Sequence, residues 1–272
     1  MKLDSEPERA GFQLRSAVRH RGTAPQDASD TSDRVAEEAP VALVINGISH
    51  AVMMVTPREL QPFAMGFVLT EGLVAKASDV YDIETREHAR SFEVEITIAQ
   101  ENFVQLKQQR RSMAGRSGCG VCGIESLELL DLKPGRITAP ALHDEASLPP
   151  AIARAAAQLG GHQQLMRATG GVHAAAWCDA SGAVLKVCED VGRHNALDKL
   201  IGHLALDGVD MRAGFVFMSS RASYELVRKA ARMNIPMLAT ISAPSTLAID
   251  VASEAGIKLV SFCRQDGCVE YT

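Results

Sequence analysis

The chain has 272 residues, a net charge of −5 with histidine neutral, and 46% hydrophobic against 22% charged residues. This length allows one or two domains with a complete core, and the composition is that of an ordinary globular protein. The acidic balance argues against general nucleic-acid binding, which usually needs a basic domain or stripe, but it leaves room for a local basic patch around a phosphorylated ligand.

No apolar stretch approaches the roughly 20 residues that a transmembrane helix needs. Residues 1–8 are charged and lack the apolar segment of a secretory signal. In a chain of this kind we expect reduced thiols, no membrane association and a cytoplasmic location.

The sequence predicts a disordered tail over residues 1–38, because this part is polar, charged and without hydrophobic periodicity. The folded region is expected over 39–272. Its first elements are two β-prone runs, 41–45 and 48–55, which flank Asn46-Gly47, a pair that strongly favours a hairpin.

A helix is expected next, with Thr56 as its N-cap, Pro57 at its first position and Gly72 near its end. Residues 80–85 and 92–98 are predicted strands. Together with the hairpin they form an N-terminal lobe that we expect to extend to about residue 135.

The second half predicts a helix at 149–159 and a hairpin from 172–178 and 184–189. Helices and strands then alternate, as helix 193–206, strand 214–218, helix 224–233, strand 237–241, helix 245–255 and strand 258–262. This order predicts an α/β fold, a mixed sheet with flanking helices and parallel neighbours on its C-terminal side.

Cys119 and Cys122 form a Cys-x-x-Cys pair with glycine at positions 118, 120 and 123. Such a pair can be half of a zinc site, a dithiol redox centre or a persulfide carrier. The preceding Arg110, Arg111 and Arg116 favour the thiolate form. A structural zinc site usually needs a second close pair, and the nearest candidate, Cys263 with Cys268, is far along the chain.

Cys178 and Cys188 fall in apolar strand patterns on either side of the predicted hairpin turn. We expect both thiols to be buried as small hydrophobic groups that face each other, or nearly so, across the hairpin.

Three polar turns each join the end of a predicted strand to the start of a helix. The first contains Arg193, His194, Asn195 and Lys199, the second contains Ser220, Arg221 and Ser223, and the third spans 242–246. Ligands of open α/β sheets bind at the carboxyl ends of the strands, where helix N-termini favour anions. The turns therefore predict one anion site, with capped and solvated helix ends as the alternative. His173, at a strand start, is equally open to a structural or a ligand role.

These segments also resemble a known family. The matching residues are Gly118–Gly123, Thr169–Ala175, Glu189–Lys199, Ser219–Glu225 and Lys258–Arg264. They are similar to the FdhD family, the formate dehydrogenase accessory sulfurtransferases.

The resemblance implies a cytidine deaminase-like fold, a homodimer and an enzymatic activity, that of a sulfurtransferase with a persulfide intermediate. Sulfur would pass from a cysteine desulfurase to the molybdenum cofactor, bis-molybdopterin guanine dinucleotide, before its insertion into the formate dehydrogenase catalytic subunit. By the same resemblance Cys119 holds the persulfide and Cys122 assists.

The resemblance also implies which residues contact the cofactor. They are Phe262, Cys263, Arg264, Gln265, Asp266 and Gly267, together with Arg193, His194, Asn195, Lys199, Ser220, Arg221 and Ser223. No structural metal is expected. Two rival interpretations stay open: a non-enzymatic chaperone that binds and delivers the cofactor, and a zinc-stabilised binding module.

Overall fold

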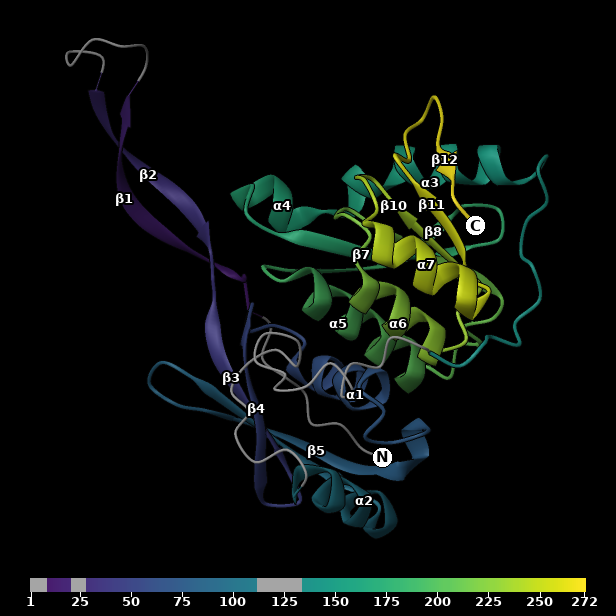
Figure 1. The fold of residues 1–272 in the computed structure, drawn as a ribbon. Coiled ribbons are helices and arrows are strands. Elements are labelled where there is room, and N and C mark those ends of the chain that lie inside the picture. Colours follow the sequence, from purple (N-terminus) through teal and green to yellow (C-terminus); the bar gives the residue numbers. More distant parts are fainter. Residues whose placement is uncertain (1–8, 21–27, 112–133) are drawn as a thin grey trace.

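The computed structural model describes residues 9–20, 28–111 and 134–272 (Figure 1). It has a four-stranded sheet in the N-terminal half, a six-stranded sheet in the C-terminal half, and a separate two-stranded ribbon. The α/β class predicted from the sequence is confirmed. Among the described residues, no helix is both long enough and apolar enough to cross a membrane.

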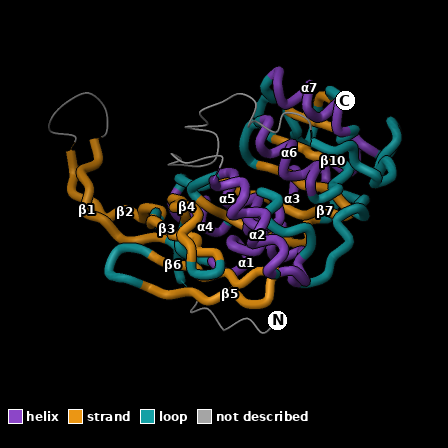
Figure 2. Tube along the Cα trace, turned by 60° about the horizontal axis from the view of Figure 1, so that its bottom comes forward, coloured by secondary structure: helices purple, strands orange, loops and turns teal. Residues whose placement is uncertain are grey.

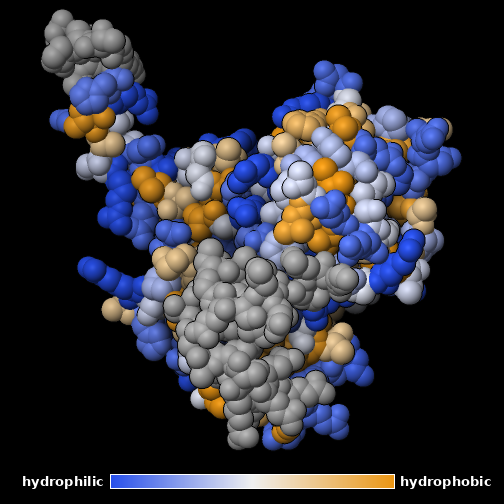
Figure 3. Space-filling model, viewed as in Figure 1, coloured by the Kyte–Doolittle hydropathy of each residue, from blue (hydrophilic) through white to orange (hydrophobic). Residues whose placement is uncertain are grey.

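The ribbon consists of β1 (Phe12–His20) and β2 (Ala28–Ala36), paired antiparallel along their whole length. It stands away from the body of the molecule (Figures 1 and 2). The prediction of a disordered tail is wrong for these strands. The prediction rested only on the inability of this segment to bury a core. The ribbon forms without a core, because cross-strand hydrogen bonds satisfy its backbone groups while side chains such as Leu14 stay 67% exposed. In Figure 3 the ribbon is mostly hydrophilic, with a few hydrophobic residues between.

The four-stranded sheet has the order β4-β3-β6-β5. Its strands are β3 (Ala39–Ile45), β4 (Ile48–Val55), β5 (Val80–Glu87) and β6 (Phe92–Ile98). The predicted hairpin is confirmed, and both turn residues take the positive φ that such a turn requires, 46° at Asn46 and 76° at Gly47. The 3₁₀ helix η2 (Ala77–Asp79) and α2 (Gln100–Arg111) complete the described part of this lobe.

Helix α1 (Leu60–Thr70) is buried along its whole length and begins later than predicted. Its N-cap is Glu59, with φ 55°, and not Thr56. The Thr56 side chain is instead fully buried and accepts a hydrogen bond from the backbone N–H of Val191 at 3.2 Å. The prediction failed because a distant segment, absent from any local pattern, competes for the threonine hydroxyl.

The six-stranded sheet has the order β12-β11-β10-β9-β7-β8. Its strands are β7 (His173–Asp179), β8 (Val184–Asp190), β9 (Gly214–Met218), β10 (Met237–Thr240), β11 (Lys258–Ser261) and β12 (Val269–Glu270). The helices of this half are α3 (Leu148–His162), α4 (Gln164–Thr169), α5 (Arg193–Leu206), α6 (Tyr224–Arg232) and α7 (Thr246–Ala255).

Helices lie on both faces of this sheet. Side chains of α5, α6 and α7 form one apolar cluster with one face, and those of α3 form another with the opposite face. Cys188 belongs to the first cluster and Cys178 to the second. Both thiols are buried as predicted. They do not face each other, because side chains alternate between the two faces of a sheet and these two point to opposite faces.

The two lobes meet where α1 packs against α5. The helices approach so closely that a Cβ added to Gly66 would lie 1.8 Å from the backbone oxygen of Asp198, and one added to Gly202 would lie 1.8 Å from that of Pro62. A buried ion pair, in which Lys229 Nζ lies 2.9 Å from Asp198 Oδ1, joins α6 to α5 beside this contact. The lobes therefore share a tightly packed interface.

Candidate functional site

The polar turns predicted to form a site lie at one edge of the six-stranded sheet. Strands β9, β10 and β11 are parallel, and β8 runs in the same direction because both β8 and β9 pair antiparallel with β7. The carboxyl ends of four strands are thus on the same side. This arrangement is the one in which α/β proteins place their ligands.

Hydrogen bonds hold two of these turns side by side. The backbone N–H of Ala222 donates to the oxygen of Ala243 at 3.2 Å, and that of Ser245 donates to the oxygen of Ala222 at 3.0 Å. Ser220 is buried, and its hydroxyl donates to the oxygen of Arg221. The Arg221 side chain is exposed. The serine thus shapes the turn, and the arginine remains available to a ligand.

The starts of α5 and α6 are connected by an ion-pair contact, with His194 Nε2 3.7 Å from Glu225 Oε2. This contact, together with a contribution from the Ser223 hydroxyl, lowers the pKa of Glu225 to about 2. The carboxylate is therefore ionised at neutral pH. Two turns that the sequence analysis identified separately meet here.

His173 lies at the start of β7, opposite Asp190 in the β-register. Partial burial lowers the pKa of His173, and the nearby positive charge of Arg193 lowers it further. The Nε atom of Arg193 is buried without a hydrogen-bond partner among the described residues. The edge therefore holds a neutral histidine and an arginine with hydrogen-bonding capacity to spare.

Lys199 and Asn195, predicted to contact a cofactor, lie in the interior instead. Lys199 Nζ is 2.7 Å from Asp190 Oδ2 and donates to the backbone oxygen of Thr56 at 2.9 Å. The Asn195 amide donates to the backbone oxygen of Met54 and to Asp190. Both side chains tie the end of β4 to the core, so we assign them a structural role.

The predicted C-terminal contact segment follows β11 at the same edge. Phe262 is 44% exposed with φ 54°, and residues 264–267 are exposed. The Arg264 guanidinium donates to the backbone oxygens of Ile241 and Cys263. Cys263 is buried, which raises the pKa of its thiol to about 12. Its side chain therefore packs in the core, and its neighbours carry the accessible groups.

The predicted catalytic pair, Cys119 and Cys122, lies outside the described residues. The four described thiols are poor nucleophiles. Burial raises the pKa of Cys178 to about 12 and also raises the pKa values of Cys188 and Cys268. None of these four, Cys263 included, has the low pKa that a reactive cysteine requires.

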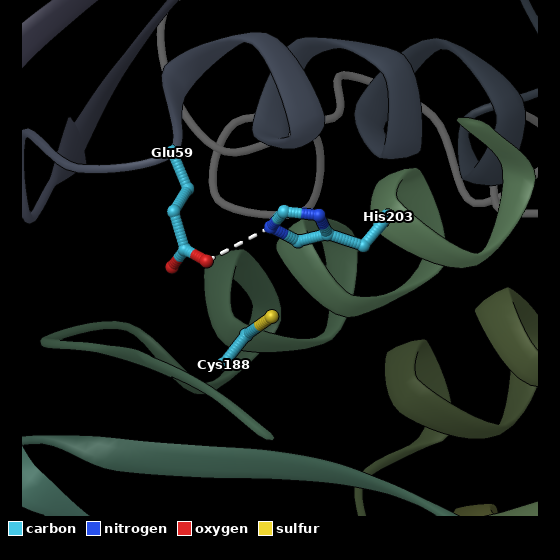
Figure 4. Close-up of side chains that lie close together, drawn as sticks. All are labelled: Glu59, Cys188 and His203. Atoms are coloured by element: carbon cyan, nitrogen blue, oxygen red, sulfur yellow. Dashed lines mark hydrogen bonds and ion pairs between the residues drawn. The ribbon is translucent and has the colours of Figure 1, made fainter. Parts of the chain in front are cut away.

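Two further features were not predicted. A cavity of about 340 Å³ lies at the opposite edge of the sheet, between the amino ends of β10 and β11 and the 137–142 segment. A group of three possible metal ligands, Glu59, Cys188 and His203, lies beneath α1 (Figure 4). No sequence signal could have found this group, because its members come from three separate segments.

Comparison with known proteins assigns the family. The model of the FdhD/NarQ family matches residues 36–272. The sulfur carrier protein FdhD of Burkholderia mallei is 58% identical over 277 residues, which cover 100% of this chain and 99% of that protein. The sulfur carrier protein FdhD of Chromobacterium violaceum is 63% identical over 240 residues, 88% of each chain.

A solved structure agrees with this assignment at the level of the fold. The crystal structure of a candidate formate dehydrogenase accessory protein from Desulfotalea psychrophila has a TM-score of 0.69 and 21% identity, and the match covers 96% of both chains. The family model and the two bacterial relatives extend over nearly the whole folded region. This chain therefore belongs to the FdhD/NarQ family.

Proposed function

We propose that this protein is a sulfur carrier in the maturation of a formate dehydrogenase. Relatives that are 58% and 63% identical are named sulfur carrier proteins. The observation that carries the proposal is the single sheet edge at which the turns of Arg193, Arg221 and Arg264 gather. Such an edge suits a large, phosphorylated acceptor of the sulfur.

The sulfur enters on Cys119. Its thiolate attacks the outer sulfur of a persulfide on a cysteine desulfurase, the S–S bond of the donor breaks, and the donor cysteine leaves as a thiolate. Cys119 then holds the persulfide. Cys122 can release this sulfur by attacking the inner sulfur atom. The products are a Cys119–Cys122 disulfide and HS⁻, and a cellular dithiol restores the two thiols.

The acceptor in this proposal is bis-molybdopterin guanine dinucleotide, bound as a substrate before its insertion into the formate dehydrogenase. Its phosphate groups are anions, which the N-termini of α5, α6 and α7 and the nearby arginines would favour. Exposed Arg221 and partly exposed Arg193 are the described groups best placed to bind them.

A chaperone function is the second candidate, because the sheet edge with Arg193, Arg221 and Arg264 could bind the cofactor without any cysteine. In that case the protein would deliver the cofactor but carry no sulfur. We further propose a cytidine deaminase-like fold for the core, a homodimeric state and a cytoplasmic location.

The test is mass spectrometry of the protein after incubation with a cysteine desulfurase and cysteine. We expect an added mass of one sulfur atom on Cys119, its loss in Cys119→Ala, and its retention in the control Cys268→Ala. Cells that make only Cys119→Ala should lack formate dehydrogenase activity. Persistent activity in these cells would reject the sulfur carrier, and cofactor binding with full maturation by Cys119→Ser would support the chaperone.

A further inference from the structure

Glu59, Cys188 and His203 bring three different ligand atoms together at the interface of the two lobes. Glu59 precedes α1, Cys188 lies on β8, and His203 lies in the last turn of α5. The carboxylate oxygen, the thiol sulfur and the imidazole nitrogen all lie within 4.8 Å of one another. Figure 4 shows the three side chains converging on one point from separate elements.

The spacing of these atoms is close to that of a metal site. In tetrahedral zinc coordination, bonds of about 2.0–2.3 Å place the ligand atoms about 3.3–3.6 Å apart. His203 Nε2 is 2.8 Å from Glu59 Oε1, so these two atoms need only separate slightly to admit an ion. The thiol sulfur of Cys188 lies within 4.8 Å of both atoms.

The burial of the group also suits a metal site. The side chains of His203 and Glu59 are only 20% and 27% exposed, and Cys188 is buried. Lys199, on the same helix as His203, is paired with Asp190 at 2.7 Å. Glu59 also holds a left-handed backbone conformation, φ 55°, which costs a non-glycine residue energy.

We propose that Glu59, Cys188 and His203 bind one Zn²⁺ ion. Thiolate, imidazole and carboxylate are all zinc ligands, and water or the second carboxylate oxygen of Glu59 completes the fourth position. On binding, the Cys188 S–H bond breaks, the sulfur bonds to the metal as thiolate, and one proton is released to solvent.

This ion would stabilise the interface between the lobes. The three ligand segments are the same segments that meet in the Thr56–Asp190–Lys199 contacts, a few residues away along each of them. The three ligands do not include Cys119 or Cys122, and the proposal does not depend on sulfur transfer.

The experiment uses the full chain with Cys119→Ala and Cys122→Ala, which removes metal binding by that pair. The purified apoprotein is titrated with Co²⁺, a spectroscopic probe for zinc, and then with Zn²⁺ in competition. We expect one equivalent of Co²⁺ to bind with a thiolate charge-transfer band in the near ultraviolet, and Zn²⁺ to displace it.

The variants assign the site. In the same background, Cys188→Ala should abolish the charge-transfer band, whereas Cys178→Ala, an equally buried thiol on the other face of the sheet, should retain it. Because loss of an outer-shell partner already costs 10–100-fold in affinity, His203→Gln should weaken Zn²⁺ binding by about 100-fold or more. If Cys188→Ala fails to fold, Cys188→Ser replaces it. An unchanged band in the Cys188 variant, or no stoichiometric binding in the background protein, would overturn the proposal.

Discussion

The substitution Lys199→Met distinguishes two roles for this lysine: a partner in a buried ion pair, or a ligand of the cofactor. The lysine is fully buried, with Nζ 2.7 Å from Asp190 Oδ2 and 2.9 Å from the backbone oxygen of Thr56. Methionine keeps most of the side-chain volume but removes the charge and both contacts. Asp190 then remains as a buried carboxylate without its counter-ion.

The structure sets the size of the expected loss. Removing one partner of a buried ion pair costs about 3–5 kcal/mol of unfolding free energy, because the other charge stays desolvated. Three other donors to Asp190, the backbone N–H groups of Thr56 and Gly192 and the amide of Asn195, remain in place. They place the expected loss at the lower end of this range.

The assay is urea-induced unfolding followed by circular dichroism, with Lys76→Met as the matched control. The Lys76 side chain is 72% exposed and its ion pair with Asp79 is 4.0 Å long, so this substitution should change the unfolding free energy by no more than about 0.5 kcal/mol. A Lys199→Met loss as small as that of the control, combined with weakened cofactor binding, would refute the structural role and restore the ligand role.

Three further predictions concern other parts of the molecule. Since the pKa of Glu225 is lowered from 4.5 to about 2, its stabilising contribution is complete above pH 4.5 and is lost as the pH falls toward 2. The difference in urea midpoint between the wild type and Glu225→Gln should therefore shrink over this interval, and a constant difference would contradict the assignment. Gly202→Ala should lower the unfolding free energy by about 1–3 kcal/mol, because its Cβ would lie 1.8 Å from a backbone oxygen of α1. The control Gly160→Ala should not lower it, because nothing lies within 4 Å of that Cβ. Equal melting temperatures of the two variants would refute this prediction. Arg221→Ala should weaken binding of the purified molybdenum cofactor in a filtration assay while leaving the persulfide on Cys119 intact, and an equal effect of the exposed control Arg212→Ala would exclude a specific contact.

The local pattern of the sequence predicted most of the regular structure. Asn46-Gly47 identified its hairpin because only a few residue types adopt the positive φ of that turn. The alternation of strands and helices after residue 184 predicted that the polar turns would share one sheet edge, because parallel strands connected by helices end on the same side. Both inferences depend on neighbours in the chain, and both are confirmed.

Tertiary structure decided which polar residues face a ligand and which face the interior. Lys199 and Arg193 both lie in α5, yet Lys199 is bound to Asp190 and to Thr56, and Thr56 lies far away in the sequence. The group of Glu59, Cys188 and His203 escaped prediction for the same reason. Periodicity reports the environment of one element, whereas burial of a polar side chain and convergence of ligand atoms depend on partners that only the packed fold brings into contact.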